Sequence, residues 1–383
     1  MAFGQTGIFQ PHNETVSPMT LYLYFARRFT MSFLGVFGIF LMLDVLLNMI
    51  DVLRRYSGTD AGAIDILTMI SLNLPRGIYP ILPLIMILAT LKMFLSLSRS
   101  SELVVTRSAG RSALRSLTSP VLVAILIGVM TVAVFNPILA ATTKKSEVMK
   151  NRFLKGTESV LSISREGLWL RQGSRQGQTV IRAQRANLDG TELFDVTFVG
   201  FAPDGLPSFR IEAESSRLTP GAWLVKNAKE WRFQDGQNAE LNAVTRDQMR
   251  VPTNLTGEQI RNGFGAPDTI PIWELAGFIR QLERAGLSTR RHKVWFQAEL
   301  SKPLMLAVMV LIGAGFTMRH TRFGHAGIMV LLALLMGTSL FFVRNFAQIL
   351  SENGQIPIIL AAWAPPIAGI LLAFGLLLHM EDG

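Results

Sequence analysis

Apolar stretches long enough to cross a membrane occur near both ends of the chain, and the polar region 141–300 separates them into two groups of three. The six stretches cover residues 29–50, 66–97, 120–140, 301–318, 326–343 and 356–378. A helix needs roughly 20 mostly apolar residues to cross a bilayer. The pattern therefore predicts an α-helical integral membrane protein with six transmembrane helices in a three plus three arrangement.

The second stretch, residues 66–97, is longer than a bilayer requires. A straight helix of this length would extend about 48 Å, against about 30 Å for the hydrocarbon core. The stretch also contains Pro75, Pro80 and Pro83. Because proline interrupts helical hydrogen bonding, we expect a kinked helix that projects beyond the bilayer.

The polar region between the two groups alternates apolar and polar residues at the period of a β-strand. ELFDVTFVGF and SFRIEAESSRL are examples, and turn sequences such as APDGLP and TPGA separate the segments. Short strands joined by tight turns, with no helices between them, are typical of antiparallel sandwiches and jelly rolls. We therefore expect an inserted all-β, jelly-roll-like domain over residues 144–269.

The segments around this domain complete the predicted organisation. Residues 1–18 form a polar tail, 19–143 hold the first three membrane helices, 270–299 form a connecting helical region, and 300–383 hold the last three. Within the connecting region, residues 270–287 have helical periodicity. The residues expected on one side of that helix are Trp273, Leu275, Phe278, Ile279 and Leu282.

The distribution of arginines predicts the orientation in the membrane. Residues 1–18 lack the apolar core of a signal peptide, so we expect the N-terminus in the cytoplasm. With six spans, the C-terminus is then expected in the cytoplasm as well. The short inner segments carry eight arginines, namely Arg27, Arg28, Arg99, Arg107, Arg111, Arg115, Arg319 and Arg322. The short outer loops, 51–65 and 344–355, carry three, namely Arg54, Arg55 and Arg344. This asymmetry agrees with the enrichment of Lys and Arg in cytoplasmic loops.

Composition supports the membrane class and excludes several activities. Only 17% of the residues are charged, below the ~25% usual for soluble domains. The net charge of +10 does not indicate nucleic-acid binding, because no RNA- or DNA-binding motif accompanies the basic residues. The absence of cysteine excludes disulfides and thiolate metal sites. No phosphate loop, HExxH or GxSxG motif is present, so we expect no catalytic residue, metal site or cofactor in this chain.

The polar segment SRSSELVVTRSAGRS, residues 98–112, separates the second and third stretches. Ser100 or Ser101 can cap a helix start, Glu102 lies in the first turn, where negative charge is favoured, and Gly110 can end the helix. An ordinary basic loop accounts for the arginines equally well. The alternative is a short cytoplasmic helix along the membrane, of the kind that an ATP-driven permease presents to a separate ATPase.

Charged residues in or beside the membrane spans are candidate binding residues, because charge is costly there. Arg54 and Arg55 follow the first stretch, and Arg76 lies near the outer end of the second. These arginines can form a basic collar for an anionic amphiphile, since guanidinium binds phosphate in a bidentate manner. The alternative is that they anchor the helices among the lipid headgroups. Asp44 could be a proton site, but a polar contact with Asn48 in a helix interface is the favoured interpretation.

The segment SELVVTRSAGRS closely resembles the cytoplasmic coupling-helix motif of the LptF/LptG (YjgP/YjgQ) permeases, which export lipopolysaccharide in Gram-negative bacteria. Further pieces along the whole chain resemble the same family: YFARRF, IDVLRR, LPRGIYPILPL, IPIILAAWAPP and the terminal HMEDG. The coupling motif is specific, whereas the number of spans alone is weak evidence. GLWLR at the start of the β region and the EDG ending resemble the LptG branch more than the LptF branch.

The resemblance assigns roles to particular residues. It implies that Glu102 docks into a groove of an ATPase subunit, with Leu103, Val104 and Arg107 beside it. It also implies that the residues facing a phosphorylated lipid headgroup are Arg54, Arg55, Arg76, Lys150 and Arg152. One departure is Asn48, where some family members carry Lys, so the headgroup collar can be built differently here.

The resemblance also implies a cellular context. The chain would be a multi-pass inner-membrane protein with a periplasmic β domain, extracting lipopolysaccharide from the outer leaflet and passing it to a periplasmic bridge. The implied partners are a second six-span permease like LptF, a cytoplasmic ATPase dimer like LptB, a single-span jelly-roll protein like LptC and a bridge protein like LptA. ATP and Mg²⁺ would be used by the ATPase, and the first and fifth spans would form lateral gates with the second permease.

A hypothesis from another class is a mechanotransmission or scaffold protein with a periplasmic interaction domain that moves no substrate. It predicts an apolar helix bundle without a cavity, whereas the permease hypothesis predicts a cavity open to lipid. A membrane enzyme ranks third, for lack of any catalytic constellation.

Overall fold

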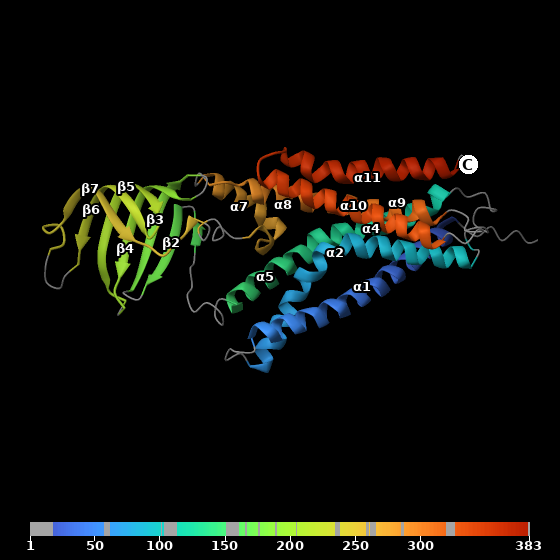
Figure 1. Ribbon diagram of the computed structural model, residues 1–383, viewed down its shortest axis with the longest axis horizontal. Helices are drawn as coiled ribbons and strands as arrows, with labels where there is room; N and C mark the ends of the chain where they lie inside the picture. Colours follow the sequence, from blue (N-terminus) through green and yellow to red (C-terminus); the bar gives the residue numbers. More distant parts are fainter. Residues whose placement is uncertain are drawn as a thin grey trace, which may run out of the picture.

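The structure is a computed structural model. It describes residues 18–56, 62–100, 102, 113–150, 161–164, 167–174, 177–187, 190–203, 205–233, 238–257, 260, 266–284, 287–318 and 326–381. In this part of the chain, long helices form a bundle at one end of an elongated molecule and an antiparallel sheet forms the other end (Figure 1).

The helices of the bundle belong to two groups that lie before and after the sheet in sequence. Before the sheet come α1 (Pro18–Tyr56), α2 (Ala63–Arg99), α4 (Ala113–Met130), the π-helical turn η1 (Thr131–Phe135) and α5 (Asn136–Lys150). After it come the 3₁₀ turn η3 (Pro267–Thr269), α7 (Ile272–Arg284), α8 (Arg290–Leu300), α9 (Lys302–Thr317), α10 (Ala326–Glu352) and α11 (Ile358–Glu381). The start of α1 and the end of α11 lie at the same end of the bundle, far from the sheet (Figure 1).

The predicted apolar stretches all lie within helices of the bundle. Among the residues that the structure describes, five helical spans are long and apolar enough to cross a membrane, with α4, η1 and α5 forming one of them. A sixth is possible if α8 and α9, which meet at an angle of 48°, form one broken span. The structure thus supports a multi-span membrane protein with five or six spans, and the count of six depends on this bent pair.

Helix α2 changes direction along its length, as its prolines predict (Figure 1). Pro75, Pro80 and Pro83 all lie inside the continuous helix Ala63–Arg99. Pro80 has no N–H to donate to the carbonyl group of Arg76, so the helix is weakened next to that arginine.

The core of the bundle is built around α9. Almost every residue of this helix is buried, and it shares one core with Met86, Ile87 and Phe94 of α2. A helix that is apolar on all sides is expected at the centre of a bundle. By contrast, α1 and α10 expose many large apolar residues, such as Met42, which is 69% exposed. These exposed faces suit lipid or an apolar partner helix.

The sheet contains seven antiparallel strands in the order β1 to β7. The strands are β1 (Leu161–Ser164), β2 (Gly167–Ser174), β3 (Gly177–Ala186), β4 (Glu192–Phe201), β5 (Pro207–Thr219), β6 (Ala222–Arg232) and β7 (Val244–Pro252). Each strand pairs with its neighbour in sequence, so the described strands form a single meander. The predicted all-β region is present, but the jelly-roll topology is not confirmed, because a jelly roll needs Greek-key crossings between two sheets.

A row of irregularities crosses the middle of the sheet. Asp195 in β4 and Asn227 in β6 have left-handed backbone conformations, with φ of 54° and 51°, and the pairing registers skip both residues. The buried face of β4 includes both Leu193 and Val196, three positions apart, so the alternation changes phase at Asp195. The pairing register is the same before and after both residues, so the strands stay aligned while their buried face changes.

Helix α7 joins the sheet to the bundle. Leu282, near its end, is buried in the core under the sheet, whereas Leu275 and Ile279 belong to a separate cluster with Trp295 of α8. The helix that was predicted over 270–287 is therefore present, and its apolar face contacts both parts of the molecule. Trp273 was wrongly placed on that face: it is 70% exposed, and its indole Nε1 donates to the carbonyl oxygen of Ala133 at 3.2 Å.

Candidate functional site

A polar cavity lies between α1, α2 and the end of α5, where the bundle approaches the sheet. Its volume is about 360 Å³. Seven lining residues come from α1, three from α2 and one from α5: Asp44, Leu47, Asn48, Asp51, Val52, Arg55, Tyr56, Asn73, Arg76, Gly77 and Lys150. Three of the five predicted headgroup residues, namely Arg55, Arg76 and Lys150, thus line one cavity although they belong to three different helices.

Close packing of α1 on α2 forms the floor of this cavity. A Cβ atom at Gly77 would lie 2.0 Å from Oδ1 of Asp44, so only glycine at position 77 allows the two helices to approach this closely. Asn48 donates its side-chain N–H to the backbone carbonyl oxygen of Asp44 at 3.0 Å. Oδ2 of Asp44 is buried and has no hydrogen-bond partner among the described residues. The favoured interpretation of Asp44, a polar contact in a helix interface involving Asn48, agrees with this geometry.

Ion pairs hold two of the three cavity cations. Arg55 pairs with Asp51, one turn earlier on α1, at 3.0 Å, and both side chains are more than half exposed. Arg76 pairs with Asp268 of η3 at 3.4 Å. Ser146 of α5 donates to the side-chain oxygen of Asn73 at 2.8 Å, which ties α5 to α2 beside the cavity. The Arg55–Asp51 pair is well exposed and the Arg76–Asp268 pair is partly exposed, so water weakens both. An anionic ligand can therefore compete with Asp51 or Asp268 for its arginine.

The other two predicted headgroup residues are Arg54 and Arg152. Arg54 is exposed on α1, next to Arg55, but is not one of the lining residues. Arg152 lies outside the described residues. Sequence reasoning missed Asp51, Asn73 and Asp268. Asn73 and Asp268 meet residues of other elements, which no local pattern signals. Asp51 could have been found, because it lies one turn before Arg55 on the same helix.

Glu102 lies at the opposite end of the bundle, immediately after α2. It is the only one of the four predicted coupling residues that the structure describes, since Leu103, Val104 and Arg107 lie outside the described residues. The Tyr24 hydroxyl donates to Oε2 of Glu102 at 2.6 Å, and the Ser100 hydroxyl donates to Oε1 at 2.7 Å. The Tyr24 hydrogen bond is the main cause of a pKa of Glu102 below its usual value, so the side chain is an oriented carboxylate at neutral pH.

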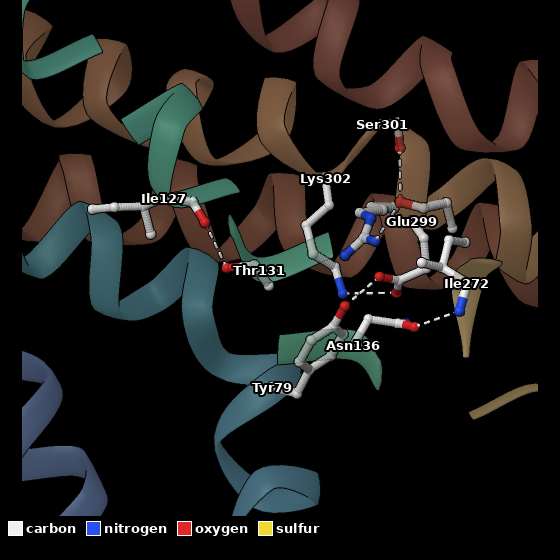
Figure 2. A network of polar contacts seen from close by, with 10 residues as sticks. Tyr79, Ile127, Thr131, Asn136, Ile272, Glu299, Ser301 and Lys302 are labelled. Atoms are coloured by element: carbon white, nitrogen blue, oxygen red, sulfur yellow. Dashed lines mark hydrogen bonds and ion pairs between the residues drawn. The ribbon is translucent and has the colours of Figure 1, made fainter. Parts of the chain in front are cut away.

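A buried polar network occupies the break between α8 and α9 (Figure 2). The Tyr79 hydroxyl of α2 donates to Oε2 of Glu299, and Nζ of Lys302 donates to Oε1 of Glu299 at 2.7 Å. The ammonium group of Lys302 also lies 3.4 Å from the centre of the Tyr79 ring. Arg344 of α10 donates to the carbonyl oxygen of Ala298 at 3.3 Å.

The network was not predicted from the sequence, although a signal was present. Glu299 and Lys302 flank the start of the predicted span 301–318, and charge at a span end is expensive unless it is paired. Arg344 was assigned to an outer loop, and this assignment is wrong: α10 continues to Glu352, and Arg344 is only 7% exposed. The apolar run ends at residue 343, but the helix continues, and Arg344 turns towards α8, where it donates to the carbonyl oxygen of Ala298.

The layout of two helix groups around a β insertion, with a basic cavity and a polar segment after the second helix, suits a membrane permease. The family model for the lipopolysaccharide export system permease LptF/LptG matches residues 23–379. The chain belongs to the LptF/LptG family. The resemblance seen in the coupling motif is therefore confirmed over most of the sequence.

Relatives of this LptF/LptG family member carry the name lipopolysaccharide export system permease protein LptG. The protein of Escherichia coli strain K12 is 22% identical over 343 residues, which cover 88% of this chain and 92% of that protein. The protein of Haemophilus influenzae strain Rd is 23% identical over 360 residues, covering 92% of this chain and 97% of that protein. Together with the apolar helices, these findings identify a multi-pass inner-membrane protein, a non-catalytic permease component of lipopolysaccharide export.

Proposed function

We propose that this chain is a permease subunit of an ABC-type exporter that extracts lipopolysaccharide from the outer leaflet of the inner membrane and passes it to a periplasmic bridge. The observation that carries the proposal is the cavity lined by Arg55, Arg76 and Lys150. Three cations from three helices converge on a space large enough for the phosphate end of a headgroup. Guanidinium and ammonium groups bind phosphate through short, charge-assisted hydrogen bonds.

The position of the cavity supports lipid as the source of the phosphate. The walls of the cavity continue into the apolar surface of α1, where Leu43, Leu46 and Ile50 are exposed. A lipid can therefore place acyl chains along α1 while its headgroup reaches the cations. A volume of about 360 Å³ fits part of a headgroup rather than a whole lipopolysaccharide, so a second permease subunit would complete the binding chamber.

The energy for transport would come from a separate ATPase that binds ATP and Mg²⁺. In the proposed orientation both termini are cytoplasmic, which places Glu102 on the cytoplasmic side and the cavity near the outer leaflet. The hydrogen bond between Tyr24 and Glu102 links α1 to the end of α2, so a partner that moves Glu102 moves both helices that form the cavity. Leu103, Val104 and Arg107 would complete the docking surface.

The remaining partners follow from the proposed route of the lipid. A six-span LptF-like permease would face α1 and α10, whose exposed apolar surfaces suit a lateral gate. The ATPase would be an LptB-like dimer. An LptC-like membrane protein and an LptA-like bridge protein would extend the β domain into the periplasm. Their jelly-roll domains would pack end to end with the β domain of this chain. A scaffold protein, in contrast, has no need of a basic cavity.

The proposal can be tested by photocrosslinking in the purified complex, with a photoreactive amino acid at Asn73 in the cavity wall. Wild-type protein should capture lipopolysaccharide at this position. The variants Arg55→Ala, Arg76→Ala and Lys150→Ala should each weaken capture by about tenfold, because each removes a charge-assisted hydrogen bond worth about 1.5 kcal/mol or more.

Arg54→Ala is the matched control, since Arg54 is the neighbouring arginine on α1 but does not line the cavity. It should change capture by less than about twofold, as expected for an exposed surface charge. Equal losses for Arg54→Ala and Arg55→Ala, or no capture of lipopolysaccharide at Asn73, would contradict the assignment of the cavity.

A further inference from the structure

Arg76 is already occupied by an anion that the protein itself supplies. Oδ2 of Asp268 lies 3.4 Å from Nη2 of Arg76. Asp268 belongs to η3, the turn that follows the β domain, whereas Arg76 belongs to a membrane helix. The Arg76 side chain is 47% exposed and lines the cavity, whereas the Asp268 side chain is 19% exposed and is not one of the lining residues. The cavity therefore gives access to the pair from the Arg76 side.

The turn η3 presents Asp268 in a defined position. Pro267, the first residue of the turn, is buried, and the Thr269 hydroxyl donates to the carbonyl oxygen of Ala266 at 2.7 Å. The turn also packs against α5, whose last residue is the cavity residue Lys150. The turn and its packing on α5 therefore place Asp268 beside Arg76.

Two further contacts attach the same connector to the bundle. Oδ1 of Asn136 accepts the backbone N–H of Ile272 at 2.9 Å, at the start of α7 (Figure 2). The Trp273 indole donates to the carbonyl oxygen of Ala133 at 3.2 Å. Neither contact involves a charge. The bond between Asp268 and Arg76 is thus the one of these three contacts that an incoming anion can replace.

We infer that Asp268 is a specificity-determining residue that occupies Arg76 while the cavity is empty and is displaced by the phosphate group of the transported amphiphile. A phosphate monoester offers more charge and more acceptor oxygens than a carboxylate, and it can bind both ends of a guanidinium group. A neutral or zwitterionic lipid lacks the charge needed to displace Asp268. Displacement also releases η3 from α2, which connects occupancy of the cavity to the segment that carries the β domain.

This inference rests on the proposed function, and a binding experiment on the full-length protein in lipid nanodiscs tests it. The probes are bisphosphorylated lipid A, monophosphorylated lipid A and inorganic phosphate. Asp268→Asn should bind bisphosphorylated lipid A about two- to fivefold more tightly than wild type, the range expected on removing a half-exposed ion pair that competes with the ligand. The gain should be smaller for monophosphorylated lipid A, and it should disappear in the Arg76→Gln background.

Glu283→Gln is the matched control. Glu283 is an acidic residue of the same connector that pairs with Lys293 at 2.6 Å, and neither residue lines the cavity. This variant should bind lipid A as wild type does. An equal gain with inorganic phosphate would identify free phosphate, rather than a lipid headgroup, as the competing ligand.

A second measurement uses the unaltered protein and so does not depend on how the variants fold. Hydrogen exchange of the peptide covering residues 266–271 should accelerate severalfold when bisphosphorylated lipid A binds, because the turn loses its contact with α2. The inference is overturned if this exchange does not change, if Asp268→Asn binds no more tightly than wild type, or if its gain persists with Arg76→Gln. If instead wild type binds no lipid A, or if Arg55→Ala and Lys150→Ala leave binding unchanged, the proposed function itself fails.

Discussion

At the residue scale, Glu102 shows how one side chain can be oriented by the rest of the chain before a partner binds. Its two carboxylate oxygens accept hydrogen bonds from different elements, one from Tyr24 of α1 and one from Ser100. The hydrogen bond from Tyr24 is the largest cause of the lowered pKa. Because a lowered pKa means that the charged form is favoured, this interaction contributes fully at neutral pH and is lost as the pH falls through the lowered pKa.

We expect Tyr24→Phe to raise the pKa of Glu102 towards its usual value of 4.5, because the phenyl ring cannot donate a hydrogen bond to the carboxylate. The measurement is a pH titration of ¹³C-labelled glutamate carboxyl groups by NMR in detergent micelles, with Glu102→Gln used to assign the signal. Tyr22→Phe, on the same helix, should leave the Glu102 titration unchanged. An identical Glu102 pKa in wild type and Tyr24→Phe would show that the Tyr24 hydrogen bond does not stabilise the carboxylate.

At the scale of elements, the break between α8 and α9 is stabilised by charge as well as by apolar packing. Pro303 lies in the first turn of α9, where a missing N–H costs little, and the helix direction changes by 48°. Glu299 accepts hydrogen bonds from both Tyr79 and Lys302, which ties the break to α2. With Arg344 nearby, one buried carboxylate serves two buried cations, so the loss of this carboxylate cannot be compensated locally.

Glu299→Ala should destabilise the protein by about 3–5 kcal/mol, since it leaves Lys302 buried without its counter-ion. The expected result is a clear drop in the melting temperature of the purified protein in detergent. The double variant Glu299→Leu with Lys302→Met should recover much of this loss, because it removes both charges of the pair and keeps their volume apolar.

Glu274→Gln, at an exposed position of α7, serves as the control and should cost less than about 1 kcal/mol. If Glu299→Ala melted at the wild-type temperature, the buried network would not hold the break between α8 and α9.

At the scale of the whole molecule, α7 is the mechanical link between the bundle and the sheet. Leu275 and Ile279 pack against Val132 and Trp295 of the bundle, whereas Leu282 packs in the core under the sheet. A rigid helix that is buried in two cores at once transmits a change at one end to the other. Helix α7 therefore couples the two cores although most of their residues lie far apart in the sequence.

Leu282→Ala and Leu275→Ala should therefore have different effects. Both remove a fully buried side chain and should cost about 2–5 kcal/mol locally. Leu282→Ala should accelerate proteolysis within the sheet, and Leu275→Ala should accelerate it in the connector, as measured by limited proteolysis and mass spectrometry of the fragments.

Gly277→Ala provides the control on the same helix, because an added Cβ would meet nothing within 4 Å. It should leave the cleavage rates unchanged or lower them, since alanine favours the helix over glycine. The same cleavage pattern in both leucine variants would show that α7 does not divide its contacts between two cores.

The sequence by itself determined the elements that depend on local periodicity. Six apolar stretches predicted the membrane helices, and the alternation of apolar and polar residues predicted the strands, because both patterns record which face of a local element avoids water. The rim positions of Arg55 and Arg76 predicted that they would serve one site, since charge near a membrane span is costly and must have a use. The helix over 270–287 was also predicted, although Trp273 was placed on the wrong side.

Only the tertiary structure decided which of these residues meet. The pairing of Arg76 with Asp268, the burial of Arg344 and the phase change of the strands at Asp195 all depend on how distant elements pack. Local periodicity carries no information about such contacts. A charged residue leaves the same pattern in the sequence whether it contacts water or a carboxylate from another element. The cavity, and the Asp268 carboxylate that pairs with Arg76 beside it, arise from the folded arrangement of α1, α2, α5 and η3.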